Sequence, residues 1–373
     1  MPTIQAAPAN AADENISAVP AVGENEDTEL ESLQTENLGG LFEQLGVSLL
    51  ISTYQAGKLV IARNDGGVVN THYLDSPKPM GIATFQNQLA VGTLGEIQFF
   101  ANTPENCAKI KGDKVHDACF VPRYAHLTGE IDIHEMAFGA DGQIWFINTR
   151  FSALCTLSGS NSFTPVWRPQ FISSNAPEDR CHLNGLGLRD GKPRYVTALG
   201  ESDKPGGWRE RKADGGVLID LKTGKTICRG LSMPHSPRWY AEQLWVCESG
   251  RGTLAKVNET TGERIVVFEF PGFTRGLDFV GPLAFVGLSQ IRETATFSGI
   301  PITEKAAERN CGVWIVDVTD GTLVGILRFT KGVHEIFAVQ ALPGLRYPAI
   351  LEKLDPVVLG TYFLKPDVVA KVV

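Results

Sequence analysis

The chain contains 373 residues, of which 43% are hydrophobic and 20% are charged, and these values are typical of a globular protein. No apolar run approaches the roughly 18 residues that a membrane-spanning helix needs, so we expect no membrane association. Acidic residues outnumber basic ones by 42 to 34 and no block of Lys or Arg occurs, which argues against nucleic acid as a partner.

The cysteines and the N-terminal sequence both bear on the compartment. The seven cysteines form no Cys-x-x-Cys pair and their number is odd, which argues against a disulfide framework or a zinc ribbon. The first residues lack the basic segment and apolar core of a secretory signal. We therefore expect a reducing, cytoplasmic setting.

Changes of composition along the chain divide it into three parts. Residues 1–40 are rich in Ala, Pro, Asn, Asp and Glu, as in a disordered acidic tail. A short amphipathic helix around Leu41 to Leu45 is expected to lead into the fold. Short runs rich in Val, Ile, Phe and Trp then alternate with Gly, Asn or Asp turns, which predicts one all-β domain over residues 41–351. Residues 352–373 are left as a C-terminal extension.

A repeat runs through the β domain. Six segments each read as a strand, a polar turn and a second strand, and their starts are separated by 54, 48, 53, 40 and 59 positions. A period of about 51 residues is typical of the four-stranded blades of a β-propeller. The sequence therefore predicts a six-bladed β-propeller. The aligned starting residues are Met80, His134, His182, His235, Arg275 and His334.

The two ends of the repeat array complement each other. The segment from Ser48 to Asp75 resembles a blade without its first strand, and the last repeat, at His334, provides a first strand with too little chain after it for a full blade. We predict that they form one composite N-/C-terminal blade. Closure of this kind removes the exposed edges that an open sheet would leave.

Four of the seven histidines fall on the aligned starting position, which in a propeller faces the central channel. Converging charged imidazoles would repel one another, whereas neutral imidazoles can bind a metal ion. Nitrogen ligands favour iron or copper, with zinc as a further possibility, over calcium or magnesium. The sequence thus predicts a transition-metal site, although histidines bonded only to water and backbone remain the alternative. The expected ligands are His134, His182, His235 and His334.

Charged residues accompany this position. Glu135 and Glu335 each follow a histidine, and because strand residues alternate between faces they should point between blades. There each carboxylate could accept a histidine N–H from the adjacent blade or pair with an arginine. Arg275 takes the place of a histidine in the ring, and with Arg238 it would attract a carboxylate or phosphate of the substrate. Arg251 is either a third arginine that attracts the substrate or part of an ion pair that links two blades.

One insertion is a candidate lid. Residues 200–216 are longer, more polar and richer in glycine than the matching turns, with Trp208 at the apolar tip. An ordinary surface loop is the alternative.

The motifs DIHEMAFG, GQIWFINTRFS, CHLNGLGL, MPHSPRW, LWVCESGRG and GVHEIFAV resemble an uncharacterised family of bacterial conserved hypothetical proteins. The resemblance covers roughly Leu41 to Ile350. It implies one intact domain, and because members often occur beside or fused to tetratricopeptide repeats, it implies such a protein as a partner. More distantly, the propeller is similar to the gluconolactonase and regucalcin group, whose carboxylate and asparagine ligands are replaced here by histidines. The four-histidine iron centre of carotenoid oxygenases is a chemical analogue.

These observations together predict a metal-dependent enzyme with a multi-histidine site in the channel. We expect an oxidoreductase or oxygenase that acts on an anionic small molecule or peptide, with Arg275 and Arg238 orienting the substrate. A zinc-type hydrolase or lactonase and a noncatalytic protein-binding propeller are the alternatives.

Overall fold

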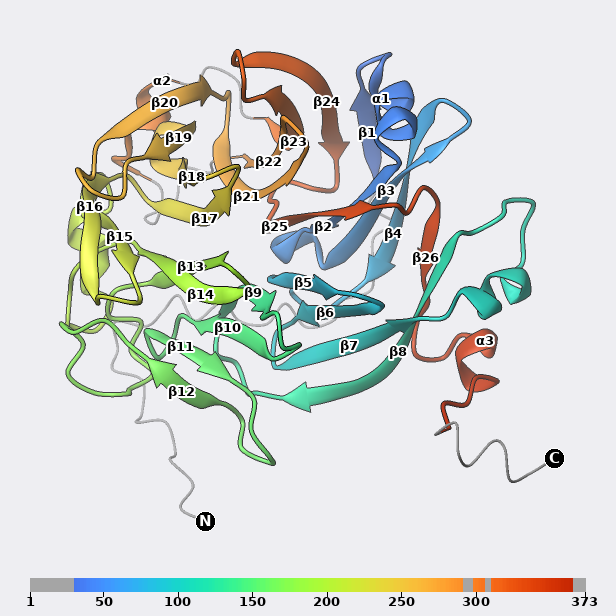
Figure 1. Ribbon diagram of the computed structural model, residues 1–373, viewed down its shortest axis with the longest axis horizontal. Helices are drawn as coiled ribbons and strands as arrows, with labels where there is room; N and C mark the ends of the chain where they lie inside the picture. Colours follow the sequence, from blue (N-terminus) through green and yellow to red (C-terminus); the bar gives the residue numbers. More distant parts are fainter. Residues whose placement is uncertain (1–29, 291–297, 306–309, 365–373) are drawn as a thin grey trace.

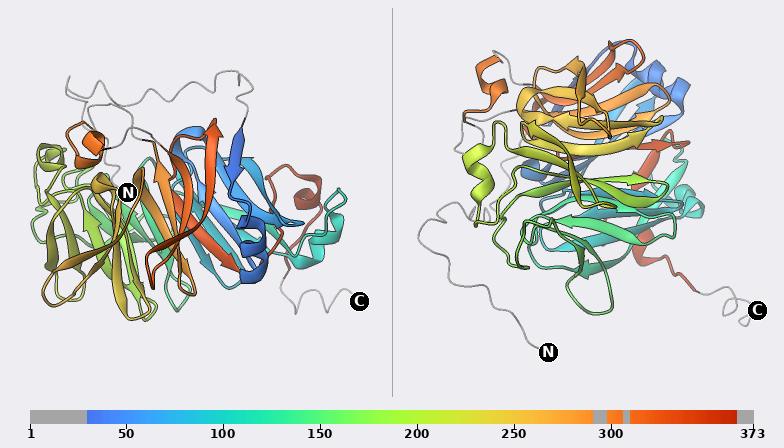
Figure 2. Two further views of the ribbon diagram at one scale, coloured as in Figure 1. Left: turned by 90° about the horizontal axis from the view of Figure 1, so that it is seen from above. Right: turned by 60° about the vertical axis from the view of Figure 1, so that its left-hand side comes forward.

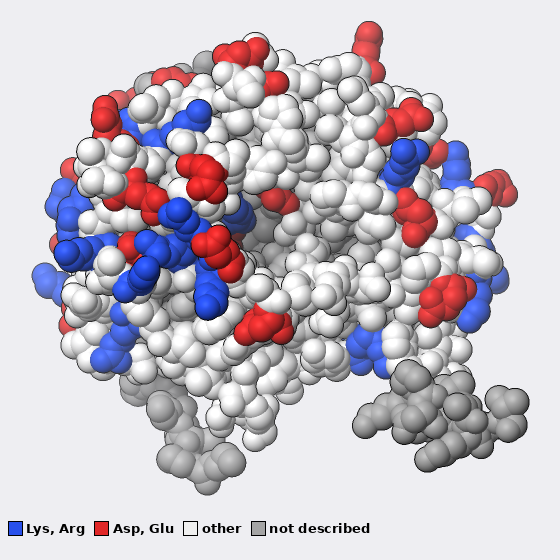
Figure 3. Space-filling view, viewed as in Figure 1, with Lys and Arg blue, Asp and Glu red and all other residues white. Residues whose placement is uncertain are grey.

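The computed structural model describes residues 30–290, 298–305 and 310–364, and these residues form six small sheets arranged in a ring (Figure 1). The prediction of an all-β, six-bladed propeller is confirmed. The innermost strands of neighbouring sheets contact one another around the axis, and the space-filling surface is hollowed at the centre of the ring (Figure 3).

We number the blades in ring order and give their strands from the inside outward. Blade 1 contains β25 (Ala338–Pro343), β2 (Val47–Ser52), β3 (Lys58–Asp65) and β4 (Val68–Asp75). Blade 2 contains β5 (Ile82–Phe85), β6 (Gln88–Gly92), β7 (Glu96–Asn102), β8 (Ala118–Leu127) and β26 (Pro348–Ile350). Blade 3 contains β9 (Ile133–Phe138), β10 (Ile144–Asn148), β11 (Ala153–Thr156) and β12 (Thr164–Trp167).

The other three blades follow the same plan. Blade 4 contains β13 (Leu183–Arg189), β14 (Lys192–Ala198), β15 (Gly216–Asp220) and β16 (Lys225–Leu231). Blade 5 contains β17 (Pro234–Tyr240), β18 (Gln243–Glu248), β19 (Thr253–Val257) and β20 (Arg264–Glu269). Blade 6 contains β21 (Phe273–Val280), β22 (Leu283–Ser289), β23 (Cys311–Asp317), β24 (Thr322–Lys331) and β1 (Glu31–Gln34).

Short helices connect or cover these strands. The α-helices are α1 (Leu38–Leu45), α2 (Pro301–Lys305) and α3 (Pro356–Leu359), and the 3-10 helices are η1 (Tyr54–Ala56), η2 (Pro104–Lys109), η3 (Gly207–Arg211) and η4 (Ser249–Arg251). Seen edge-on, α2 and η3 project from the same face of the ring (Figure 2). Within the described residues, no helix is both long enough and apolar enough to cross a membrane.

The ring closes through the predicted composite blade. β25, from the C-terminal part of the chain, pairs antiparallel with β2 from the N-terminal part, with Leu49 opposite Ala341 and Ile51 opposite Val339. These apolar side chains enter the core between blades 1 and 6. The closure therefore comes from buried apolar contacts as well as from the backbone ladder.

The tail predicted over residues 1–40 is wrong at its C-terminal end. β1 pairs with β24 at the outer edge of blade 6, and Gln34 exchanges two hydrogen bonds with the backbone of Val69 in blade 1, at 3.0 and 2.8 Å. β1 has only four residues, which are mostly polar and at most half-buried, so the sequence pattern did not indicate a strand there. Residues 1–29 lie outside the described residues.

The C-terminal segment continues the packing of blade 2. β26 pairs parallel with β8, and beyond it Asn106 Nδ2 donates to Thr361 Oγ1 at 3.1 Å. The guanidinium of Arg123 lies 3.4 Å from the centre of the Phe363 ring. The described part of the predicted extension therefore packs on the outside of blade 2.

Replacing Phe42 with alanine is expected to lower the free energy of unfolding by about 3–5 kcal/mol, because Phe42 of α1 is fully buried and meets Phe285 edge-on at 6.5 Å. Urea denaturation would measure this loss. Leu33→Ala is the control, since Leu33 is 63% exposed and should change stability by less than about 0.5 kcal/mol. A loss at Phe42 no larger than at Leu33 would contradict the packing of α1.

Candidate functional site

The aligned residues do lie where the inner strands begin. His134, His235 and Arg275 lie within the first three residues of β9, β17 and β21, and His182 directly precedes β13. His334 lies further away along the chain, four residues before β25. The repeat register thus placed these side chains at one end of the channel.

Irregular backbone surrounds these positions. The pairing of β17 with β18 shifts register between His235 and Arg238, and the pairing of β21 with β22 shifts between Thr274 and Leu277. An extra residue at such a shift bends the strand and re-aims the neighbouring side chain. The register shifts near the start of β17 and β21 therefore turn particular side chains to new directions, where a regular ladder would have continued.

Left-handed backbone conformations occur beside each of three histidines. Positive φ angles are found at Asp132 (58°), at Asp179 and His182 (47° and 50°), and at Met233 and Ser236 (46° and 50°). Such conformations cost about 1–3 kcal/mol each in residues other than glycine, and the surrounding structure must hold them. Their concentration around the histidines marks this end of the channel as the candidate site.

Two histidines from neighbouring blades meet here. The Nε2 atoms of His134 and His182 lie 3.2 Å apart, and the two rings are perpendicular with centroids 4.7 Å apart. His235, from the next blade, lies nearly parallel to His134 with a centroid distance of 6.5 Å. The structure thus brings three of the four predicted histidines together.

The hydrogen bonds of His134 determine its tautomer. Its Nδ1 lies 2.8 Å from Thr149 Oγ1 and 3.0 Å from the carbonyl oxygen of Asp132. Thr149 donates its only hydroxyl proton to the carbonyl oxygen of Leu183 at 2.6 Å, so it must accept from His134. Nδ1 therefore carries the proton, and the lone pair of Nε2 faces the channel.

His235 repeats this arrangement one blade further on. Its Nδ1 lies 2.9 Å from Ser249 Oγ and 3.0 Å from the carbonyl oxygen of Met233. Ser249 donates its proton to the carbonyl oxygen of Thr274, so it accepts from His235. Nδ1 of His235 therefore carries the proton as well, and its Nε2 carries the lone pair.

His182 is held by a carboxylate instead of a hydroxyl. Its Nδ1 lies 3.0 Å from both oxygens of Asp179, one of which also accepts from Trp208 Nε1 at 2.9 Å. The Trp208 ring lies 4.6 Å from that of His182 and is only 2% exposed. Trp208 is thus a buried contact of the site rather than an exposed loop tip, and the insertion that carries it covers His182.

His334 lies apart from the other three histidines. Its Nδ1 is 3.2 Å from Gln290 Oε1, and in the described part of the chain no ring contact joins it to another histidine. Throughout residues 30–290, 298–305 and 310–364, no group of three or more His, Cys, Asp or Glu side chains is arranged to hold a metal ion. The four-histidine centre predicted from sequence is therefore not formed.

Burial keeps two of the histidines neutral. His134 and His235 are each 5% exposed, and burial together with nearby positive charge lowers the pKa of both well below its usual value. Arg275 is one source of that charge for both rings. Neutral imidazoles with a free Nε2 can bind a metal ion or accept a proton.

Arg275 is a cation without an ion pair among the described residues, although the carboxylate of Glu335 acts on it electrostatically. Its guanidinium lies 3.6 Å from the centre of the Phe337 ring, and burial lowers its pKa to about 10, so it stays charged at neutral pH. Among the described residues it has no hydrogen-bond or ion-pair partner. The Phe337 ring also contacts His134, at 4.9 Å, and Tyr54, at 5.6 Å. An anion bound to Arg275 would therefore lie beside the histidines.

Arg238 is not available to a substrate, which corrects the sequence prediction. Its Nη2 forms an ion pair with Glu135 Oε1, and its Nη1 donates to the carbonyl oxygen of Leu186 at 3.2 Å. Glu135 Oε2 accepts from the backbone N–H of Leu186 at 3.2 Å. Glu135 thus links blades 3, 4 and 5. Of the two partners considered from the sequence, a histidine or an arginine, it contacts the arginine.

The other two charged candidates also differ from their predicted roles. Glu335 interacts electrostatically with Arg275, and within the described residues no hydrogen bond links Glu335 to a histidine. Arg251 Nε lies 2.6 Å from Glu248 Oε1, and Glu248 is fully buried. Arg251 is therefore a structural tie within blade 5.

Glu135→Gln is expected to lower the free energy of unfolding by about 3 kcal/mol, because it leaves the charge of Arg238 without its partner inside the channel. Chemical denaturation would measure the loss. Asp75→Asn removes an ion pair with Lys58 whose carboxylate is 73% exposed, and should cost less than about 1 kcal/mol. Equal stability of the Glu135→Gln protein and the native protein would refute the structural role of this pair.

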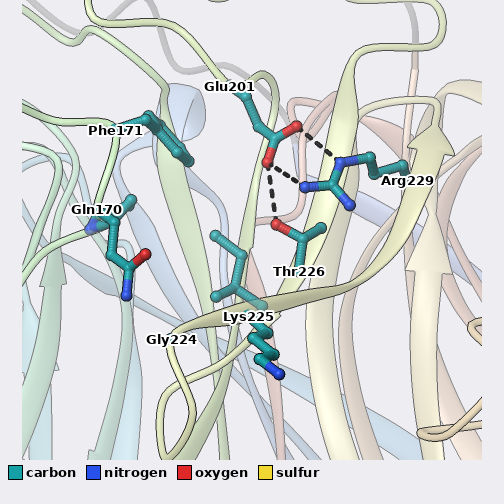
Figure 4. A pocket seen from close by; sticks show the side chains of 9 residues that line it. Gln170, Phe171, Glu201, Gly224, Lys225, Thr226 and Arg229 are labelled. Carbon is teal, nitrogen blue, oxygen red and sulfur yellow. Dashed lines mark hydrogen bonds and ion pairs between the residues drawn. The ribbon is translucent and has the colours of Figure 1, made fainter.

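Two surface grooves lie outside the channel. One, of about 450 Å³, separates Gln170 and Phe171 from Glu201, whose carboxylate accepts from Arg229 at 2.9 and 3.0 Å and from Thr226 at 2.9 Å (Figure 4). The other, of about 460 Å³, is largely apolar and lined by Trp145 and Trp167 among others. Neither groove includes a channel histidine, and the carboxylate of the first is already paired.

Comparisons with known proteins were made for the whole chain. The curated proteins give no match. A chain from the crystal structure of a nidogen/laminin complex is 10% identical with a TM-score of 0.51, covering 80% of this chain and 99% of that one. A likeness at this identity shows a shared fold.

Two further solved structures have lower TM-scores. Virginiamycin B lyase from Staphylococcus aureus is 13% identical with a TM-score of 0.39, covering 76% of this chain and 79% of that one. A gluconolactonase from Xanthomonas campestris is 14% identical with a TM-score of 0.46, covering 75% and 84%. The sequence profile of one family, described as a domain of unknown function (DUF4915), matches residues 36–351. The chain therefore belongs to the DUF4915 family.

Proposed function

We propose that the protein is a metal-dependent enzyme whose reaction centre is the histidine end of the channel. His134 and His182 would supply nitrogen ligands to a transition-metal ion, His235 faces the same space, and Arg275 would hold an anionic substrate. The observation that carries this proposal is the 3.2 Å separation of the Nε2 atoms of His134 and His182, with Nδ1 of each ring at an acceptor.

A cation between the two nitrogens would stabilise that geometry. Since both Nδ1 atoms donate, both Nε2 atoms of the neutral rings carry lone pairs, which repel at 3.2 Å unless a metal ion or a proton lies between them. His134 and His182 would hold a transition-metal ion through their Nε2 atoms. A histidine whose second nitrogen donates to a carboxylate or carbonyl is the usual form of a metal ligand.

The ligand atoms also restrict which metal ions could bind. Neutral imidazoles suit iron, copper or zinc and leave the charge of the ion uncompensated. Two protein nitrogens would leave open positions for water, oxygen or substrate. The guanidinium of Arg275, which shares the Phe337 ring with His134 and forms no ion pair among the described residues, supports an anionic substrate, because a carboxylate or phosphate could accept hydrogen bonds from it.

A specific observation favours a second candidate, in which the pair works without a metal. Asp179 accepts from Nδ1 of His182, which is the carboxylate–histidine arrangement of many proton-transferring sites. A proton shared between His182 and His134 would then make the pair a general acid and base. This reading keeps the role of Arg275 and removes the metal.

Oxygen dependence tests the type of reaction. We prefer an oxidoreductase or oxygenase because nitrogen ligands with open positions resemble oxygen-activating iron or copper centres. Oxygen uptake should then accompany turnover of a carboxylate or phosphate substrate, or of an acidic peptide. Equal turnover under anaerobic conditions would point to the hydrolase or lactonase alternative.

A tetratricopeptide-repeat partner stays a prediction.

A further inference from the structure

Asp179 occupies a central position that the sequence analysis missed. It lies in the segment just before β13, and one carboxylate serves three groups at once. Both of its oxygens lie 3.0 Å from His182 Nδ1, Oδ2 accepts from Trp208 Nε1 at 2.9 Å, and Arg209 Nη2 lies 3.7 Å from the same oxygen. Asp179 thus joins a histidine of the candidate site to the insertion that covers it.

The backbone of this residue is itself constrained. Asp179 has a φ of 47°, and its N–H donates to the carbonyl oxygen of Arg150 at 2.9 Å. His182, three residues later, has a φ of 50°. A strained conformation held at both residues fixes the distance between the carboxylate and the imidazole.

The flanking residues tie the same segment to the insertion. Arg180 Nη1 lies 2.6 Å from Asp203 Oδ1, and the N–H of Gly206 donates to the carbonyl oxygen of Glu178 at 3.0 Å. Each residue of the tripeptide Glu178 to Asp179 to Arg180 therefore contacts the insertion. A displacement of the insertion would therefore change the position of the Asp179 carboxylate.

We infer that Asp179 is a positioning residue that fixes Nε2 of His182 toward His134 and couples His182 to the insertion. Without the carboxylate, His182 can carry its proton on Nδ1 or on Nε2. In the Nε2–H tautomer, an N–H rather than a lone pair points toward a metal ion. The coupling to Trp208 means that the cover of the site and the orientation of His182 change together. This inference rests on the proposed function.

The test uses the full-length protein, stripped of metal with a chelator, and Co²⁺ alone as the probe. Asp179→Asn should weaken Co²⁺ binding by about 10–100-fold, the usual effect of removing a carboxylate behind a metal-bound histidine. Asp179→Glu should recover part of the affinity, because it restores a carboxylate. Asp75→Asn is the matched control: it makes the same substitution at an exposed carboxylate of blade 1 that pairs with Lys58 and contacts neither His182 nor the insertion, so its affinity should equal that of the native protein.

A second readout does not depend on metal. In ¹⁵N-histidine-labelled protein without metal, the shift of His182 Nδ1 should indicate a protonated nitrogen in the native chain, whether or not Nε2 shares a proton with His134, and a partly unprotonated one in Asp179→Asn. Circular dichroism should show that the variant is folded. Unchanged His182 shifts together with unchanged Co²⁺ affinity in Asp179→Asn would overturn the inference.

The two proposals fail in different ways. If His134→Ala and His182→Ala bound Co²⁺ as tightly as the native protein, the proposed metal site would be wrong, whereas the tautomer of His182 would still test Asp179. If His182→Ala lost binding but Asp179→Asn lost neither binding nor the tautomer, only the role of Asp179 would be wrong.

Discussion

Replacing His134 with alanine is expected to abolish tight binding of a transition-metal ion and, with it, turnover. His134 contributes one of the two nitrogens that lie 3.2 Å apart, and its ring also contacts Phe337 next to Arg275. One remaining imidazole cannot hold the ion against competition from buffer. Metal content after native purification and Co²⁺ titration of the stripped protein would measure the loss.

His334→Ala is the matched control for this variant. It removes the same side chain from the same repeat position, but His334 contacts Gln290 rather than the other histidines. We expect it to retain its metal and its activity. Loss of metal in His334→Ala to the same extent as in His134→Ala would show that the three-histidine grouping is the wrong description of the site.

Replacing Arg275 with alanine should raise the KM for an anionic substrate by about 30-fold or more while leaving metal content intact. Loss of one partner of a buried charged contact costs at least about 2 kcal/mol, and each 1.4 kcal/mol is a factor of about ten. Arg275 touches Phe337 and lies outside the histidine pair, so removing it should not release the metal. Steady-state kinetics and metal analysis of the same preparation would measure both effects.

Arg275→Lys separates charge from geometry. Lysine restores a positive charge but not the planar, bidentate guanidinium, so the KM should recover only in part. A KM that is unchanged in both variants would remove Arg275 from substrate binding. A KM raised equally for a neutral analogue would show that its effect is steric rather than electrostatic.

The repeat made the architecture predictable from sequence. A period of about 51 residues indicates a blade, and the missing first strand at one end matches the spare first strand at the other. Both features come from short-range patterns of apolar and turn residues, which the chain must keep to pair its strands. By contrast, β1 has four half-exposed residues and depends on Gln34 meeting Val69 of another blade, a contact that no local pattern encodes.

The site was predictable only as far as the repeat extends. Alignment identified His134, His182 and His235, but not that His334 would lie apart, because the chain before β25 contains extra residues outside the strand. The partner of Glu135 could not be chosen from the sequence, because it depended on which long side chain reaches the carboxylate from another blade. Arg238 does so over blade 4, a geometry that strand alternation does not specify.

The partners that fix the imidazoles did leave a signal. Thr149 and Ser249 occupy the same repeat position, directly after the second strand of their blades, and each donates to the inner strand of the next blade. Ser52 and Ser289 make the corresponding bond in other blades. A hydroxyl at this position in each of these repeats could have been noticed in the sequence. Asp179 could not, since it lies outside the aligned segments.

The most direct test of the central claim is the metal content of the native protein compared with that of His134→Ala combined with His182→Ala. Both proteins would be purified without added metal or chelator and analysed by inductively coupled plasma mass spectrometry, with circular dichroism to confirm folding. The account predicts about one iron, copper or zinc ion per native chain and none in the double variant. A native protein without metal, or a folded double variant that keeps the same metal content, would contradict it.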